Sequence, residues 1–222
     1  MKASPWCAPL RVGLVTGLSA EALVAAPLGM TMPGGGTPEG AAAVAALLAL
    51  RGATALVSFG LCGGLDPALA PGALVVPRRV DRWMCDAALT AALGGATADL
   101  LHAGSAIAAT VAQKAALFAA TGAAAIDLES GAVAEVAARH GLPFAVLRAV
   151  CDPAGLALPP AALLALDAGG SIRPWGIAAT VLRHPGQIPA LIGLGRAASA
   201  ARAALVGRVA QIMLGGGSGS VL

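Results

Sequence analysis

Apolar runs of strand length alternate, over the first two thirds of the chain, with alanine-rich stretches of helix length. None of these runs shows the in-and-out alternation of a half-exposed strand, and they predict strands at Leu10–Thr16, Ala53–Phe59, Ala73–Val76, Ser105–Ala109, Ala123–Asp127 and Pro143–Val150. Because strands apolar on both sides must be covered on both faces, the pattern favours a central, mostly parallel, twisted sheet between helices. We therefore predict one three-layer α/β/α domain over residues 1–214.

Helices are predicted between these strands at Pro38–Leu50, Val111–Ala120 and Leu128–Arg139. The first two follow a threonine, which is a favoured capping residue, and the first opens with proline. From residue 159 onward the pattern is helical only and ends in an amphipathic stretch, Ile188–Met213, that should pack on the sheet. Residues 215–222 have linker composition and are predicted to be a disordered Gly/Ser tail.

Charge and aromatic content exclude a nucleic-acid-binding protein. Lys and Arg number 14 against 11 Asp and Glu, and the resulting +3 is spread along the chain rather than gathered in a patch. Aromatic residues make up 3% and tyrosine is absent, so there is little material for a base-stacking platform.

A mean hydropathy of +0.82 raises the question of a membrane protein. The longest charge-free stretch, Ala22–Pro38, is interrupted by prolines and a glycine run, whereas a spanning helix needs about 20 continuous apolar residues. No uninterrupted apolar region and small-residue cleavage site follow Lys2, so we expect no signal peptide and a cytoplasmic location. Four scattered cysteines without C-x-x-C spacing predict reduced thiols and no metal site (Cys7, Cys62, Cys85 and Cys151).

Carboxylates follow three of the predicted strands, where parallel sheets bind ligands. Glu21 comes after the first strand, Glu129 after the fifth and Asp152 after the sixth, in a chain that is only 11% charged. Each has a structural alternative: the two glutamates could be first-turn helix residues, and Asp152 could belong to a turn before Pro153. The glycine-rich segment Gly60–Gly64 follows the second strand and could be a simple turn; it fits neither G-x-G-x-x-G nor a Walker pattern.

Together, four segments resemble the purine nucleoside phosphorylase and nucleosidase superfamily, in that family's order. They are residues 12–17 leading to Glu21, residues 57–67 with 71–76, residues 126–130 and residues 143–152, and they cover the chain from Arg11 to Pro153. The sequences of residues 58–60, 63–67 and 128–134 most resemble those of the hopanoid-associated nucleoside phosphorylases. That branch is thought to remove adenine from adenosylhopane, which implies a nucleoside phosphorylase-like fold and an enzyme that cleaves a 5′-substituted adenosine.

The resemblance implies a role for each candidate residue. Asp152 would be the acid or hydrogen-bond partner at purine N7, Glu129 would accept hydrogen bonds from the ribose hydroxyls, and Leu128 would pack under the sugar. Glu21 aligns with the carboxylate that positions attacking water in the nucleosidases. Substrate would also contact the second-strand segment (Gly60, Leu61, Cys62 and Gly63). An acid near the purine can protonate the leaving group, and an anion near the sugar can stabilise the oxocarbenium-like transition state.

The nucleophile could be water or phosphate. Backbone amides at Gly17, Gly34 and Gly35 could cradle a phosphate, and Arg78 of a neighbouring subunit could assist. However, no Lys or Arg lies between Arg11 and Arg51, and Glu21 would repel a dianion. We therefore favour water, with inorganic phosphate as the alternative co-substrate and no other cofactor.

Two departures from the family pattern affect the substrate. Leu61 stands where relatives often have Ser, and the stretches at residues 22–33 and 105–129 are short, which would leave room for a bulky 5′ group such as a hopane. The alternatives are a general 5′-methylthioadenosine/S-adenosylhomocysteine nucleosidase or a degenerate nucleoside-binding relative. We expect a homodimer or higher homo-oligomer that binds a small-molecule nucleoside and contacts the inner membrane transiently.

Other polar residues rank lower as site candidates. His102 and His140 lie within two residues of a glycine at predicted element ends, which is typical of surface or capping positions. Arg148 lies within an apolar strand, where a charge needs a partner that Glu129 or Asp127 could provide.

Overall fold

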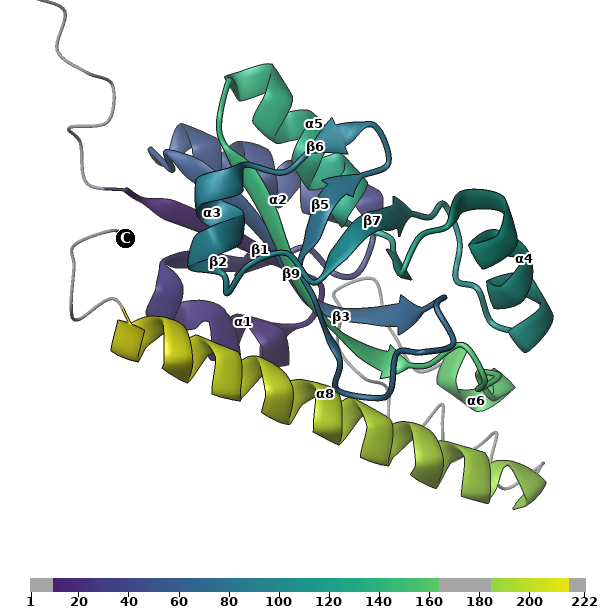
Figure 1. The fold of residues 1–222 in the computed structure, drawn as a ribbon. Helices are drawn as coiled ribbons and strands as arrows, with labels where there is room; N and C mark the ends of the chain where they lie inside the picture. Colours follow the sequence, from purple (N-terminus) through teal and green to yellow (C-terminus); the bar gives the residue numbers. More distant parts are fainter. Residues whose placement is uncertain (1–9, 164–184, 216–222) are drawn as a thin grey trace, which may run out of the picture.

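The computed structural model describes residues 10–163 and 185–215 and forms a central sheet with helices on both faces (Figure 1). The strands run in the order β2-β1-β3-β8-β7-β5-β6, while β9 lies beside β3 and β4 beside β9. Their bounds are β1 Val12–Thr16, β2 Met30–Pro33, β3 Ala55–Gly64, β4 Leu74–Val75, β5 Pro77–Val80, β6 Trp83–Met84, β7 Ala98–Ala103, β8 Ala125–Asp127 and β9 Phe144–Asp152. The helices are α1 Ser19–Ala25, α2 Pro38–Leu50, α3 Ala87–Ala92, α4 Val111–Thr121, α5 Ser130–His140, α6 Pro160–Leu163 and α8 Ile188–Gly215, with short 3₁₀ helices at Ala26–Leu28 and Pro185–Gln187.

Most strand pairs of the sheet are parallel, as predicted. β1 pairs in parallel with β2 and β3, β3 with β9, β5 with β7, and β7 with β8. Antiparallel pairing is confined to β3 with β8, β4 with β9 and the β5–β6 hairpin. Because β3 is long, it pairs with β9 along most of its length and reaches β8 only at Gly63 and Gly64.

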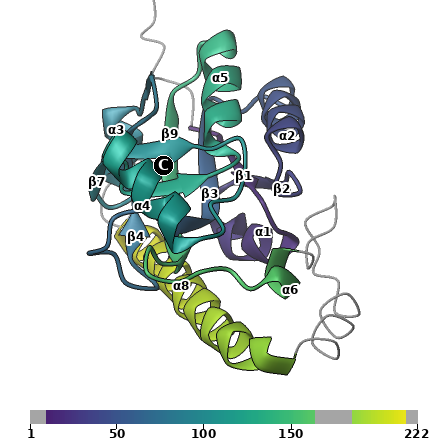
Figure 2. The same ribbon diagram turned by 90° about the vertical axis from the view of Figure 1, so that its right-hand side faces the viewer.

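The two faces of the sheet carry separate apolar cores, so the predicted cover on both faces is confirmed. Along β3, Leu56 and Cys62 pack with α2 and α5, whereas Val57 and Phe59 face the side of α1, α3 and α8. Figure 2 shows α8 on the side of the sheet opposite α2 and α5. Side chains of successive strand residues point to opposite faces, so a strand buried on both sides reads as one apolar run.

Two predictions about the elements were wrong. Residues 105–109 form no strand; the strand in that region is β7, whose exposed Asp99 and half-buried His102 hid it from an apolar search. Gly60–Gly64 is not a turn after the second strand but the second half of β3. Four short elements were not predicted, namely α1, β2, α3 and the β5–β6 hairpin, although the first-turn reading of Glu21 pointed to α1.

The predicted packing of the C-terminal helix on the sheet is confirmed. One face of α8 is buried against the domain through Ala197, Ala201, Leu205, Val209 and Ile212. Among the described residues, α8 is the one helix long and apolar enough to cross a membrane by length and composition, a test that packed core helices also pass. The predicted tail overlaps α8 at Gly215, and residues 216–222 lie outside the described part of the chain.

Candidate active site

The three strand-end carboxylates are all buried at the carboxyl edge of the sheet. Glu21 lies in the first turn of α1, Glu129 directly precedes α5, and Asp152 is the last residue of β9; their exposed fractions are 6%, 7% and 6%. Figure 1 shows α4 and α6 beyond the same edge. Buried carboxylates are rare without partners, so the contacts of each one show what holds it there.

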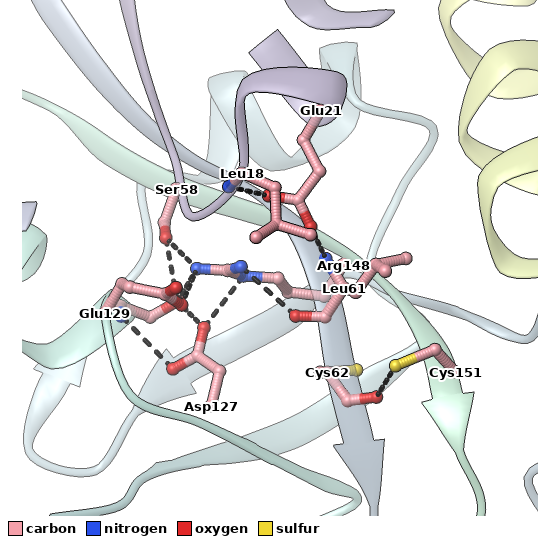
Figure 3. Close-up of polar contacts among 10 residues, drawn as sticks. Leu18, Glu21, Ser58, Leu61, Cys62, Asp127, Glu129, Arg148 and Cys151 are labelled. Atoms are coloured by element: carbon pink, nitrogen blue, oxygen red, sulfur yellow. Dashed lines mark hydrogen bonds and ion pairs between the residues drawn. The ribbon is translucent and has the colours of Figure 1, made fainter. Parts of the chain in front are cut away.

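Arg148 on β9 is the cation that pairs with one of these carboxylates, Glu129, and with a further one, Asp127 (Figure 3). Its Nη2 lies 2.9 Å from Glu129 Oε2, and its Nε lies 2.8 Å from Asp127 Oδ2. The Nε–H bond does not point at Asp127, so that contact is an ion pair without a hydrogen bond. Both partners that the sequence offered for Arg148 are therefore confirmed. Burial acts to lower the pKa of Arg148, but the surrounding carboxylates raise it above its ordinary value, so the guanidinium stays charged.

Two serines complete the surroundings of Arg148. Arg148 Nη2 donates to Ser58 Oγ at 2.7 Å, and Ser130 Oγ donates to Asp127 Oδ2. Ser58 lies on β3 and Ser130 begins α5, so these bonds tie the sheet to the helix that presents Glu129. We call Arg148, Asp127, Glu129 and Glu21 the Arg148 cluster.

Glu21 joins two segments that are far apart in the sequence. One carboxylate oxygen accepts the N–H of Leu18 at 2.8 Å, as a capping side chain would, and the other accepts the N–H of Leu61 on β3 at 2.9 Å. Gly60 makes room for it: φ is +149° there, and a Cβ would lie 2.7 Å from the Glu21 carboxyl carbon. Burial raises the pKa of Glu21, opposed by Arg148 and by the backbone amides.

Glu129 adopts helical dihedrals but makes no capping hydrogen bond, so its carboxylate is free to face the cluster. A Cβ at Gly17 would lie 2.5 Å from Glu129 Oε1, so a residue with a side chain would obstruct that oxygen. Burial raises the pKa of Glu129 to about 7, with Asp127 and Glu21 adding to the rise and Arg148 opposing it. A carboxyl group with this pKa titrates near neutral pH.

Asp152 has its own cation, Lys114, which the sequence analysis overlooked. Lys114 Nζ lies 2.6 Å from Asp152 Oδ1 and donates to the carbonyls of Pro153 at 3.0 Å and Leu156 at 2.7 Å. Lys114 is fully buried, and it shares a face of α4 with Leu117 and Phe118. That i, i+3, i+4 spacing was the signal that could have shown it to point inward. We call these two residues the Lys114 pair.

The other residues predicted to contact substrate lie along β3 and before α5. Leu128 is half-buried, Leu61 donates to Glu21 and accepts from Arg148 at 3.2 Å, and Cys62 is buried with its pKa raised well above the ordinary value by burial. At Gly63 a Cβ would lie 3.7 Å from Asp152 Oδ2. The oxygen of Asp152 that Lys114 does not hold thus faces the glycine-rich half of β3.

The glycines expected to cradle a phosphate lie beside the carboxylates. Gly17 adjoins both Glu129 and Glu21, and the N–H of Gly34 donates to Thr16 O at 2.6 Å. Gly35 has a positive φ of +76° in the turn before α2. In the described residues near these glycines, the buried cations Arg148 and Lys114 both have carboxylate partners.

The lower-ranked histidines lie elsewhere. His102 Nδ1 lies 2.9 Å from Asp81 Oδ1 on the far side of β8, and His140 ends α5. A small apolar cavity of about 20 Å³ between β1, α3 and α8 is lined by no charged residue and is not a candidate site. No cluster of metal-ligating side chains occurs in the part of the chain that the structure describes.

This fold and this edge of the sheet define an α/β enzyme of the nucleoside phosphorylase and nucleosidase class. Residues 21–98 and 96–165 match the family model of the phosphorylase superfamily, a region that contains all three carboxylates. The chain belongs to the phosphorylase superfamily. No curated protein matches the chain.

Solved structures with the same fold include two nucleosidases and a futalosine hydrolase. The 5′-methylthioadenosine/S-adenosylhomocysteine nucleosidase of Neisseria meningitidis, in complex with methylthio-immucillin-A, superposes with a TM-score of 0.65 at 16% identity over 92% of this chain and 98% of its own. The corresponding enzyme of Colwellia psychrerythraea, in complex with adenine, gives 0.61 at 17% identity over 91% and 96%. Futalosine hydrolase of Helicobacter pylori gives 0.58 at 14% identity over 65% and 88%.

Proposed function

We propose that this enzyme hydrolyses the N-glycosidic bond of a 5′-substituted adenosine, releases adenine, and acts on adenosylhopane in hopanoid side-chain biosynthesis. The observation that carries the proposal is the convergence of Glu21, Glu129 and Asp152 at one edge of the sheet, each with a separate set of partners. The family and the purine-bound neighbours support the purine nucleoside, and the resemblance of residues 58–67 and 128–134 to the hopanoid-associated branch supports the lipid substituent.

Each carboxylate has a role that the chemistry requires. Water adds to C1′ while the C1′–N9 bond breaks, and the bonding electrons leave with the purine. Glu21 accepts the proton that water loses, and Asp152 gives a proton to N7 of the leaving base, so protons balance over the reaction. Glu129, charged and held by Arg148, accepts hydrogen bonds from the ribose hydroxyls and stabilises the positive charge that develops on the sugar.

Water is the better nucleophile for this site because the described cations are already paired. A phosphate dianion would have to approach the Arg148 cluster, in which three carboxylates surround one guanidinium. Glu21, with its pKa raised by burial, is suited to take a proton from water. Phosphorolysis is the alternative that the assay separates, but the structure weakens the predicted phosphate cradle, because the N–H of Gly34 donates to Thr16 O and that of Gly17 faces Glu21.

A lipid-linked substrate calls for contact with the membrane that contains it, and α8 has a suitable surface. Its exposed side includes Ile188, Ile192, Val206, Met213 and Leu214. The helix carries three arginines and no acidic residue, a combination that favours the interface of an anionic bilayer. We propose a transient association of this helix with the membrane, and a homo-oligomeric enzyme, to be measured by vesicle co-sedimentation and light scattering.

The deciding experiment measures adenine release from three substrates: adenosylhopane, 5′-methylthioadenosine and S-adenosylhomocysteine. Each is assayed with and without inorganic phosphate, and the sugar product is identified by mass spectrometry. We expect the highest kcat/KM for adenosylhopane and a free ribosyl product in both conditions. Higher kcat/KM for the small thio-nucleosides would favour the general nucleosidase. A strict phosphate requirement with a sugar 1-phosphate product would overturn hydrolysis, and binding without turnover would indicate a degenerate relative.

A further inference from the structure

The Lys114 pair contains a buried ammonium group that the proposed reaction has not yet used. Lys114 is fully buried, and its Nζ has oxygen atoms of Asp152, Pro153 and Leu156 within 3.0 Å. Its shortest contact, at 2.6 Å, is to the side chain of Asp152 rather than to a backbone carbonyl. A lysine that only joined α4 to the chain after β9 could do so through the carbonyls alone.

The contact divides the two oxygens of Asp152. Oδ1 is held by Lys114, while Oδ2 lies on the side of Gly63, where a Cβ would be 3.7 Å from it and 3.2 Å from Ile126 Cγ2. Oδ2 is therefore the oxygen available to a purine that lies along the glycine-rich half of β3. Burial raises the pKa of Asp152, which favours a proton there, and Lys114 opposes that rise.

We propose that Lys114 is a positioning residue that makes Asp152 a stronger acid at the moment of base departure, an inference that rests on the proposed cleavage of a purine nucleoside. As the Oδ2–H bond breaks and the N7–H bond forms, the negative charge appears on the Asp152 carboxylate. The Lys114 ammonium at Oδ1 stabilises that charge. The interaction is stronger after proton transfer than before it, so it lowers the barrier rather than only binding substrate.

The inference predicts a change in the pH profile, which a purely structural lysine would not produce. In Lys114→Met the carboxylate loses its cation, so the pKa of Asp152 rises. The basic limb of the profile, which is the fall of kcat at alkaline pH as Asp152 loses its proton, therefore moves to higher pH. The maximal kcat falls about 10- to 100-fold, the worth of one charged hydrogen bond, while KM changes little. Lys114→Arg keeps the charge and the position of the limb.

The experiment compares kcat against pH for wild type, Lys114→Met, Lys114→Arg and Ala115→Met, an exposed position on the same helix that controls for the added methionine. Lys114→Gln removes the charge but keeps an N–H group that can donate to the carbonyls. If Lys114→Met folds poorly, Lys114→Gln must show the same shift of the basic limb. Combining Lys114→Met with Asp152→Asn should cost no more than about threefold beyond Asp152→Asn alone, because Lys114 acts through Asp152.

An unmoved basic limb in both uncharged variants, or losses that multiply in the double variant, would overturn the inference. Failure of the proposed function is a separate result, since the wild-type enzyme would then release no adenine from any of the three nucleosides. Wild-type adenine release with an unmoved limb rejects the role of Lys114 alone.

Discussion

The Arg148 cluster and the Lys114 pair balance buried charge differently. In the cluster one guanidinium faces Asp127, Glu129 and the nearby Glu21, so negative charge is in excess. In the pair one ammonium faces one carboxylate. Burial raises the pKa of Glu129 to about 7, and the two further carboxylates of the cluster add to that rise.

The difference matches the two demands of N-glycosidic cleavage. Positive charge develops on the sugar, so a half-site rich in negative charge is useful beside it. The departing purine needs a proton, so a carboxylic acid is useful beside it. A cation next to that acid stabilises the carboxylate that remains after the proton has left. The assignment of the cluster to the sugar and the pair to the base is part of our proposal, and variants of one residue in each half can separate them.

The largest expected effect is at the Lys114 pair. Asp152→Asn retains the size of the side chain and an oxygen for Lys114 but carries no transferable proton. Loss of a positioned acid typically lowers rate by about 10²–10⁴-fold, so we expect kcat for adenine release to fall by that amount. Circular dichroism should report an unchanged fold. Near-normal turnover would reject Asp152 as the acid.

A smaller and more selective effect is expected at Glu129. Glu129→Gln should reduce kcat/KM for a ribonucleoside by about 10- to 150-fold, the worth of a charged hydrogen bond, but should affect the 2′-deoxy analogue much less. The measurement is the ratio of the two kcat/KM values in wild type and variant, with Glu135→Gln, exposed on α5, as the matched control. Equal losses on both substrates would remove Glu129 from the sugar hydroxyls.

The acid limb of the wild-type profile tests the charge excess itself. If Glu129 must be ionised and its pKa is about 7, kcat/KM should fall about tenfold from pH 8 to pH 6. In Glu129→Gln that limb should flatten, since the titrating group is gone, while Asp152→Asn should leave it in place. An acid limb that persists in Glu129→Gln belongs to another group, for which Glu21 is the first candidate.

Sequence patterns predicted the central elements of the fold well. The segments of β1, β3, β8 and β9, and α2, α4 and α5, are long apolar runs or capped alanine-rich stretches, and each was predicted within a few residues of its start. β7 was missed because its polar side chains break the apolar run, and the extent of β3 was missed because glycines in a strand read as a turn. Pairing with β8 and β9, which is not visible locally, keeps those glycines extended.

The candidate site was only partly predictable from the sequence. Strand-end position singled out Glu21, Glu129 and Asp152, and the need of a buried arginine for a partner pointed to Asp127 and Glu129. Lys114, Ser58 and Ser130 were overlooked, because a lysine or serine in a predicted helix or strand is ordinary until the tertiary fold shows what it faces.

The smallest expected effect is on stability, and it is confined to the Arg148 cluster. The unfolded chain ionises Glu129 above its ordinary pKa of 4.5, whereas the folded protein retains the proton up to about pH 7. The folded state therefore binds more protons in that window, so this group's contribution to stability falls as pH rises through it. Glu129→Gln removes the penalty and should raise Tm at pH 8 by about 2–4 °C, equivalent to about 1 kcal/mol. Asp152→Asn should leave Tm nearly unchanged at both pH values, because the proposed acid already carries its proton in the working pH range and the amide oxygen can still accept from Lys114. Thermal melts at pH 5 and pH 8 measure both variants, and the gain in Glu129→Gln should shrink at the lower pH, where folded wild-type Glu129 is protonated and the unfolded chain is less fully ionised. A loss of stability in Glu129→Gln at pH 8 would show that the Arg148 cluster carries no excess of negative charge.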